Sequence, residues 1–229
     1  MKLTILGSGT SQGIPVIACD CPVCRSADPH DKRLRASAML DIKGKKIIID
    51  AGPDFRYQML RSQVKDLRAI LLTHGHKDHI GGLDDVRAFN WVKQGAVDVY
   101  GNEGTREVVY KDFSYAFAAF RYPGVPEINY HVIDDRPFYI DDIQVVPIPV
   151  LHYKMPVLGF RIGNFAYITD AKTIPASSME RLKGVEYLVI NALRKELHMS
   201  HFNLEEALTM IARIQPKSAF LTHIGHQMG

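Results

Sequence analysis

Apolar residues occur in short runs along most of this chain, and glycine, proline or polar residues end each run. Runs of this kind are typical of buried strands, whereas apolar residues spaced three and four apart indicate helices. This pattern predicts strands at 2–6, 37–42, 46–50, 69–72, 97–100, 158–162, 165–169, 187–191 and 218–222, with several more between 130 and 151. It predicts helices at 55–64, 83–91, 103–120 and 204–214.

The order of these elements indicates the fold class. Two strand-rich halves, each followed by helices, predict an α/β fold of two packed sheets with helices outside. The chain of 229 residues shows no linker, charge run or low-complexity segment, so we expect a single hydrolase domain over 1–229. Asn203 and Glu206 form a capping-box-like start for the last helix, and Pro216 ends it.

Potential metal ligands cluster directly after the apolar run 69–72. They are His74, His76, Asp78 and His79. Imidazole and carboxylate groups suit zinc, manganese or iron. Four donors on one turn cannot all face a single ion, so His74 and His76 are expected to hold one metal and Asp78 and His79 a second. The sequence therefore predicts a two-metal hydrolytic site.

The same local pattern recurs twice later in the chain. Thr73-His74, Thr169-Asp170 and Thr222-His223 each place a threonine and then a potential ligand after an apolar run. His152 also follows an apolar run. We expect strand ends to bring these donors to one rim, with His152 joining the first metal, His223 the second, and Asp170 bridging both. Asp50 is expected to orient a histidine ring by accepting a hydrogen bond from the ring nitrogen that does not face the metal.

Composition excludes several classes of protein. The apolar fraction of 46% and charged fraction of 23% are those of a globular domain, and no apolar run is long enough to span a membrane. The N-terminal residues lack the apolar stretch of a signal peptide, so a cytoplasmic location is expected. The net charge of +3 is too small to indicate nucleic acid binding. A homodimer is compatible with the sequence, which does not determine the oligomeric state.

All three cysteines lie in one loop at about 19–24. Cys19, Cys21 and Cys24 are an odd, tightly clustered set, which favours metal binding over disulfides. Their spacing together with one distant histidine suits a tetrahedral structural zinc, and His226 is the expected fourth ligand. The alternative is three reduced cysteines without a metal.

Together these residues resemble the metallo-β-lactamase superfamily. The resemblance rests on His74-x-His76-x-Asp78-His79 with Asp50, His152, Asp170 and His223. It implies a four-layer αβ/βα sandwich that carries a dinuclear metal site. The superfamily contains lactamases, thioesterases, nucleases, phosphodiesterases and oxidoreductases, so the resemblance alone does not specify a substrate.

A narrower resemblance rests on the glycine-rich segment 7–15 and the cysteine loop. Both are similar to the phosphonate-utilisation branch of the superfamily, the phosphoribosyl 1,2-cyclic phosphate phosphodiesterases of the carbon–phosphorus lyase pathway. That branch has a histidine before the last helix that assists phosphate chemistry, which His201 matches better than His198. Relatives usually extend further beyond the position of His226 than this chain does. Pyrroloquinoline-quinone biosynthesis proteins share a similar cysteine loop.

The resemblance implies a metal-dependent phosphodiesterase acting on a small or cyclic phosphodiester. Two divalent ions, manganese or zinc with iron as an alternative, would activate water, and one further zinc would be structural. Asp78 and a protonated His201 are the expected catalytic residues. Lys154, Lys172 or Arg194 could hold a substrate phosphate, although solvated surface positions are the simpler interpretation of each.

Three alternatives remain open. Another hydrolase on the same scaffold, such as a thioesterase or lactamase, is one. Transfer-RNA 3′-end processing is disfavoured, because we find no long basic or glycine-rich insertion to grip RNA. A cofactor-biosynthesis carrier without turnover is the third.

Overall fold

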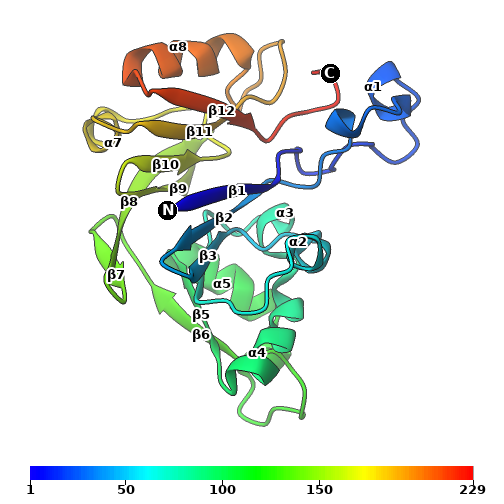
Figure 1. The fold of residues 1–229 in the computed structure, drawn as a ribbon, viewed down its shortest axis with the longest axis vertical. Helices are drawn as coiled ribbons and strands as arrows, with labels where there is room; N and C mark the ends of the chain where they lie inside the picture. Colours follow the sequence, from blue (N-terminus) through cyan, green and yellow to red (C-terminus); the bar gives the residue numbers. More distant parts are fainter. Residues whose placement is uncertain (229) are drawn as a thin grey trace. The chain divides into compact units, whose positions relative to one another are not determined.

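The computed structural model describes residues 1–228, and the chain divides into two compact units. Unit 1 comprises Met1–Gly7 and Ala36–Asp134, and unit 2 comprises Ser8–Arg35 together with the chain from Asp135 onward. Each unit contains one six-stranded mixed sheet with its own helices (Figure 1). The expectation of a single hydrolase domain stays a prediction.

The sheet of unit 1 has the strand order β1-β2-β3-β4-β5-β6. The strands are β1 (Lys2–Gly7), β2 (Ser37–Ile42), β3 (Lys45–Ile49), β4 (Ala69–Leu71), β5 (Val97–Gly101) and β6 (Ile128–Val132). The first three strands pair antiparallel, and β3 to β6 pair parallel. Because parallel strands end at the same edge of a sheet, the residues after β3 and β4 become neighbours there.

Helices cover this sheet through one apolar core. They are α2 (Phe55–Arg61), α3 (Lys77–Ile80), the 3₁₀ helix η2 (Leu83–Val86), α4 (Arg87–Lys93), α5 (Glu103–Asp112) and α6 (Ser114–Phe117). Phe55 and Phe89 meet edge to face with ring centroids 6.2 Å apart, and both pack into the cluster that holds Ile48 and Ile70. Removing these side chains from water is what holds the helices on the sheet.

The helix predicted at 103–120 is wrong in its length. The structure has two short helices, with a break at Phe113, whose backbone (φ −115°, ψ 35°) leaves the helical region. The break lets the chain fold back so that Phe117 stacks on Tyr110 at a centroid distance of 3.9 Å. Packing of aromatic rings, rather than helix periodicity, therefore determines this segment.

The sheet of unit 2 has the order β12-β11-β10-β9-β8-β7. Its strands are β7 (Phe138–Ile140), β8 (Ile143–His152), β9 (Met155–Ile162), β10 (Phe165–Ile168), β11 (Tyr187–Asn191) and β12 (Ser218–Thr222). The helical segments of this unit are α1 (Pro22–Arg25), η1 (Pro29–Asp31), α7 (Ala176–Arg181) and α8 (Leu204–Ile214). β10, β11 and β12 run parallel, so the residues after them share one edge.

Helix α8 lies along β11 and β12 (Figure 1). Its predicted capping box is confirmed. The side chain of Asn203 accepts a hydrogen bond from the Glu206 backbone, and the Glu206 side chain accepts one from the backbone of Asn203. This reciprocal cap fixes the point at which the preceding loop becomes a helix.

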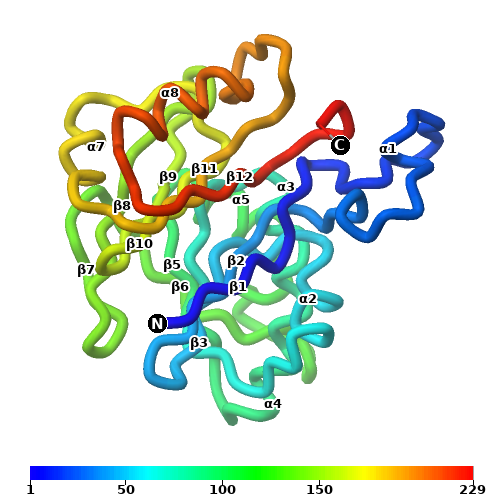
Figure 2. The backbone as a smooth tube through the Cα atoms, turned by 45° about the horizontal axis from the view of Figure 1, so that its top comes forward, coloured from blue at the N-terminus to red at the C-terminus, as the bar shows by residue number. Residues whose placement is uncertain are grey.

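The cysteine segment and the chain after β12 lie side by side in unit 2, although they are far apart in sequence (Figure 2). The backbone of Ile224 donates to Ser8 at 2.8 Å and accepts from Thr10 at 2.9 Å. The Arg33 guanidinium also bonds the backbone oxygen of Met228 at 3.0 Å. These contacts bring the region of His226 to the cysteine loop. Among residues 1–228, no helix is long and apolar enough to cross a bilayer.

Candidate metal centre

The first donor cluster lies where β4 of unit 1 gives way to α3. His74 follows the strand, His76 caps the helix, and Asp78 and His79 lie within it. The ring of His74 lies 4.5 Å from that of His76 and 4.2 Å from that of His79, measured between centroids. Asp78 Oδ2 lies 3.1 Å from His79 Nε2. Two ligands of one tetrahedral zinc lie about 3.3 Å apart, so Asp78 and His79 are placed to share an ion.

Asp50 is buried behind this cluster and accepts several hydrogen bonds. His79 Nδ1 donates to its carboxylate at 2.7 Å, and the Thr73 backbone and hydroxyl donate at 2.8 and 2.9 Å. The bond to Asp50 puts the hydrogen of His79 on Nδ1 and leaves Nε2 available to a metal. Thr73 Oγ1 also lies 3.0 Å from His74 Nδ1, so the same carboxylate orients His74 through the hydroxyl. This geometry is what the predicted orienting role of Asp50 requires.

Two glycines permit the close packing of the Asp50 loop against α3. A Cβ at Gly52 would lie 1.9 Å from the backbone oxygen of Asp78, and a Cβ at Gly82 would lie 2.1 Å from that of Gly52. Both distances are far inside van der Waals contact with rigid backbone atoms. Side chains at these positions would push the carboxylate of Asp50 away from the histidines.

The second donor cluster lies within unit 2, at the ends of β8, β10 and β12. Asp170 Oδ1 lies 3.2 Å from His223 Nε2 and 3.3 Å from His201 Nδ1. The ring of His201 stacks on that of His223 at 4.8 Å and lies 4.5 Å from that of His152. Ligand atoms of His152, Asp170 and His201 lie within 4.8 Å of one another. The structure thus brings together the three late donors and His201, which are distant in sequence.

Backbone contacts hold this cluster in place. His152 Nδ1 lies 2.9 Å from the carbonyl oxygen of Ser200, and a carbonyl can only accept, so Nε2 of His152 is the ring nitrogen left available to a metal. The Asn191 side chain accepts from the Ala171 amide at 2.8 Å and donates to the Ala171 carbonyl at 3.0 Å. Sequence reasoning missed Asn191, although it too is a polar residue at the end of an apolar strand.

Several site residues adopt the left-handed backbone region. The φ angles are +63° at Asp50, +54° at Asp170 and +54° at His223. Residues other than glycine rarely adopt this conformation, because it costs about 1 kcal/mol or more. It turns each side chain sharply away from the strand that precedes it. The same backbone region is also adopted at other positions, such as Lys43 and Gln94, so it is shared by the site but not confined to it.

His201 differs from its predicted charge state. Burial has the largest effect and lowers the pKa of His201 to about 3, because attraction by Asp170 offsets it only in part and repulsion from the neighbouring imidazoles adds to it. The expectation of a protonated His201 is therefore wrong for the protein alone at neutral pH. A neutral imidazole still donates one hydrogen bond.

The three candidate phosphate-binding cations have different surroundings. Lys172 Nζ forms an ion pair with Glu206 at 2.6 Å, so a local carboxylate balances its charge. Lys154 Nζ lies 5.4 Å from the ring centroid of Tyr153 on the exposed surface. Arg194 lies in the loop that carries His201, and its Nη2 donates to the backbone oxygen of Leu197.

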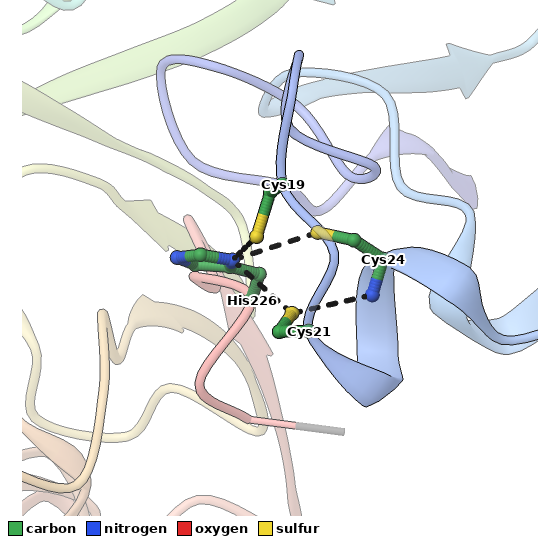
Figure 3. Close-up of side chains that lie close together, drawn as sticks. All are labelled: Cys19, Cys21, Cys24 and His226. Atoms are coloured by element: carbon green, nitrogen blue, oxygen red, sulfur yellow. Dashed lines mark hydrogen bonds between the residues drawn. The ribbon is translucent and has the colours of Figure 1, made fainter.

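The cysteines and His226 form a separate cluster in unit 2 (Figure 3). His226 Nδ1 lies 3.2, 3.4 and 3.5 Å from the sulfurs of Cys19, Cys21 and Cys24. One ring nitrogen has a single lone pair or a single hydrogen, so it cannot form three ordinary hydrogen bonds. A tetrahedral zinc with three sulfur ligands and one nitrogen ligand would place these atoms about 3.5 Å apart. The residues therefore fit a structural zinc.

The thiol of Cys21 agrees with that fit. A hydrogen bond from the Cys24 amide, followed by weaker contacts, lowers the pKa of Cys21 to about 6. A thiolate is the form that binds zinc. Cys21 also accepts this amide bond as the N-cap of α1, so the short helix orients the ligand.

Comparison with known proteins identifies the family. Residues 45–224 match the model of the beta-lactamase superfamily domain. The chain belongs to this superfamily. A solved structure described as a new diphosphatase from the PhnP family shares 41% identity and a TM-score of 0.93, over 99% of this chain and 87% of that one. The expected superfamily and the αβ/βα sandwich fold are confirmed.

Other relatives carry different names. Zn²⁺-bound PqqB from Methylobacterium extorquens shares the fold at a TM-score of 0.80 and 20% identity, over 99% of this chain and 90% of that one. An octanoyltransferase of Porphyromonas gingivalis is 42% identical over 99% of this chain and 46% of its own length. A ribonuclease Z of Nostoc punctiforme is 30% identical over 72% of this chain and 47% of its own length. The chain thus spans about half the length of the last two proteins.

Proposed function

We propose that this protein is a metal-dependent hydrolase that cleaves small phosphate esters, with a phosphodiester as its preferred substrate. The similarity to a PhnP-family diphosphatase, at 41% identity over nearly the whole chain, is the observation that carries this proposal. It points to chemistry at phosphorus. The two donor clusters support it, because their imidazoles and carboxylates suit a pair of divalent ions.

The proposed ligands are those expected from the sequence. His74, His76 and His152 would hold one ion, Asp78, His79 and His223 the other, and Asp170 would bridge them. Such ions supply an activated water and neutralise charge at phosphorus. The chain's own part is to hold the imidazoles as Nε2 ligands, as the contacts of His79 with Asp50 and of His152 with Ser200 do.

His201 is the proposed hydrogen-bond donor to the leaving oxygen. It lies beside Asp170 and contacts the rings of His152 and His223. A neutral His201 can donate a hydrogen bond to an oxygen on which negative charge develops, and the proton that this oxygen takes up after bond cleavage comes from solvent. Departure of a sugar alkoxide from a cyclic diester needs such help, whereas a p-nitrophenolate leaves without it.

An organic diphosphate is the second candidate substrate, because the PhnP-family relative is described as a diphosphatase. Hydrolysis of a diphosphate and hydrolysis of a phosphodiester both need attack at phosphorus and stabilisation of negative charge on the departing oxygen. The octanoyltransferase and ribonuclease Z relatives add octanoyl transfer and RNA cleavage as competing reactions. We favour a small substrate over RNA, because the net charge of +3 supplies little attraction for a polyanion.

The test is a substrate panel with purified protein supplied with manganese or zinc. It contains bis(p-nitrophenyl) phosphate, a ribosyl 1,2-cyclic phosphate, a nucleoside diphosphate sugar, octanoyl coenzyme A and a transfer-RNA precursor. We expect the cyclic ester to be cleaved with the highest kcat/KM. We also expect His201→Ala to slow it about a hundredfold or more, and bis(p-nitrophenyl) phosphate less.

Metal content measured on the same samples separates a failed site from a wrong substrate. About three metals per chain, with one zinc resistant to chelation, is the expected content. Cleavage of octanoyl coenzyme A or transfer RNA alone would refute the phosphate ester assignment. Full metal content without cleavage of any substrate would favour a carrier without turnover.

A further inference from the structure

A groove in unit 1 lies between α2 and the segment formed by η2 and α4. Its volume is about 390 Å³. Sites for small ligands in proteins occupy about 300–1,000 Å³, so the groove is large enough to hold one. None of the candidate metal ligands lines it, and it is therefore a site separate from both donor clusters.

The walls of the groove are mainly apolar. Met59 and Leu60 line it from α2, and Ala88, Phe89 and Val92 line it from α4. Residues three and four apart lie on one face of a helix, so each helix turns a face toward the same space. Leu60 is 59% exposed and Val92 is 67% exposed. An apolar ligand between them would remove both side chains from water.

The floor of the groove is already assembled. Phe55 and Phe89 line it and meet edge to face within the core of unit 1, with ring centroids 6.2 Å apart. A Cβ at Gly82 would lie 2.7 Å from the Cβ of Phe55, so the chain after α3 packs closely against this residue. A ligand that binds a preformed apolar surface avoids most of the cost of ordering side chains.

The charges at the start of α2 balance each other. Arg56 and Asp85 line the groove, and Asp85 lies in the turn that follows Gly82. Because Gly82 packs against Phe55 at the start of α2, the Asp85 carboxylate lies at the same end of the helix as Arg56. Its negative charge offsets the positive charge of the guanidinium there.

Lys65 is a cation at the other end of α2 without such a carboxylate. It follows the last turn of the helix, is exposed, and forms no ion pair or side-chain hydrogen bond within residues 1–228. Asp66, the next residue, does not line the groove. A lysine stem can cover apolar surface while its ammonium stays in water. An alkyl chain that ends in an anionic group therefore matches both the walls and this cation.

We propose that this groove binds a single-chain aliphatic carboxylate, a free fatty acid of medium length. The carboxylate would pair with Lys65, and the chain would lie between Leu60 and Val92 over the two phenylalanine rings. Helix α2 is roughly 10 Å long, a length that about eight extended methylene groups span. The inference is independent of the hydrolysis proposed above.

The test is calorimetric titration of hexanoate, octanoate, decanoate and dodecanoate into the metal-loaded protein, each below its micelle concentration. Each added methylene should strengthen binding about two- to fourfold up to about ten carbons, and the gain should then stop because the chain leaves the groove. Octanol should bind about two- to fivefold more weakly than octanoate, since an exposed ion pair contributes little. Affinity that rises without a plateau would overturn the proposal.

Variants separate the groove from the metal ions, which can also bind a carboxylate. Ala88→Trp fills the groove from an exposed position and should weaken octanoate binding at least tenfold. Ala212→Trp, the same change at an exposed position of α8 in unit 2, should bind octanoate as the wild type does. Lys65→Gln should bring octanoate and octanol to equal affinity. Wild-type octanoate binding by Ala88→Trp, or an unchanged preference for octanoate in Lys65→Gln, would refute the site.

A spectroscopic readout locates the ligand without relying on a variant that could misfold. With methyl-labelled methionine, octanoate should shift the signal of Met59, which lines the groove, and leave that of Met179 in unit 2 unchanged. Equal shifts of both signals, or of neither, would contradict the assignment. Binding of the protein to phosphatidylcholine–phosphatidylglycerol vesicles without binding of octanoate would overturn it in favour of a lipid surface.

Discussion

Replacing Asp50 with asparagine should weaken metal binding without removing any ligand. The carboxylate accepts from His79 Nδ1 and from both the backbone and the hydroxyl of Thr73. An asparagine has one oxygen and one amide nitrogen, so one of these donors would then face another donor. The lowest-cost solution is that His79 Nδ1 becomes the acceptor and the ring hydrogen moves to Nε2.

The magnitude follows from what that hydrogen does. With a hydrogen on Nε2, His79 can bind a metal only after an unfavourable tautomer change. Loss of such a carboxylate–histidine contact typically lowers metal affinity about 10- to 100-fold, which corresponds to about 1.4 to 2.7 kcal/mol. Asp50 is fully buried, so water cannot take the place of the missing acceptor.

Chelator competition gives the metal affinity, and nitrogen chemical shifts of the histidine rings give the tautomer. Asp98→Asn is the matched control. Asp98 Oδ1 lies 2.9 Å from His131 Nε2, a comparable contact, but Asp98 pairs with Ala69 at the start of β4, away from the strand end that precedes His74. Wild-type metal affinity in Asp50→Asn, or a loss equal to that in Asp98→Asn, would refute this reasoning.

Three further predictions concern parts of the fold outside this contact. Cys21→Ser should remove one zinc per chain and lower the thermal midpoint, since structural zinc contributes folding energy; an unchanged zinc count would exclude the zinc site. Asn191→Ala should reduce kcat and destabilise the protein by about 1 to 3 kcal/mol, because both hydrogen bonds to Ala171 are lost beside Asp170; denaturant titration and steady-state kinetics test this. For Asp98, burial would raise the pKa, but hydrogen bonds from His131, Arg68 and Asn129 outweigh it and lower the pKa to about 2. Ionised Asp98 therefore contributes fully to the free energy of unfolding above about pH 4, and this contribution is lost as the pH falls through 2. Acid titration of Asp98→Asn should lack this part of the pH dependence of stability.

The sequence alone determined the features that depend on local spacing. Short apolar runs marked the strands, Asn203 and Glu206 marked the start of α8, and the clustered histidines and cysteines marked the donors. These signals are local, because strand alternation, helix capping and ligand spacing act over a few residues. The superfamily and the sandwich fold could be predicted from them, as the comparisons confirm.

Only the tertiary structure decided which partner each donor has. Asn191 beside Ala171, the Ser200 carbonyl beside His152 and Glu206 beside Lys172 are contacts between segments that no local pattern connects. The neutral state of His201 likewise depends on burial among rings from other strands. Hydrogen-bond partners, burial and charge depend on which segments meet in space. The sequence therefore indicated the candidate ligands, and the fold determined the hydrogen-bond partners that set their tautomers and charges.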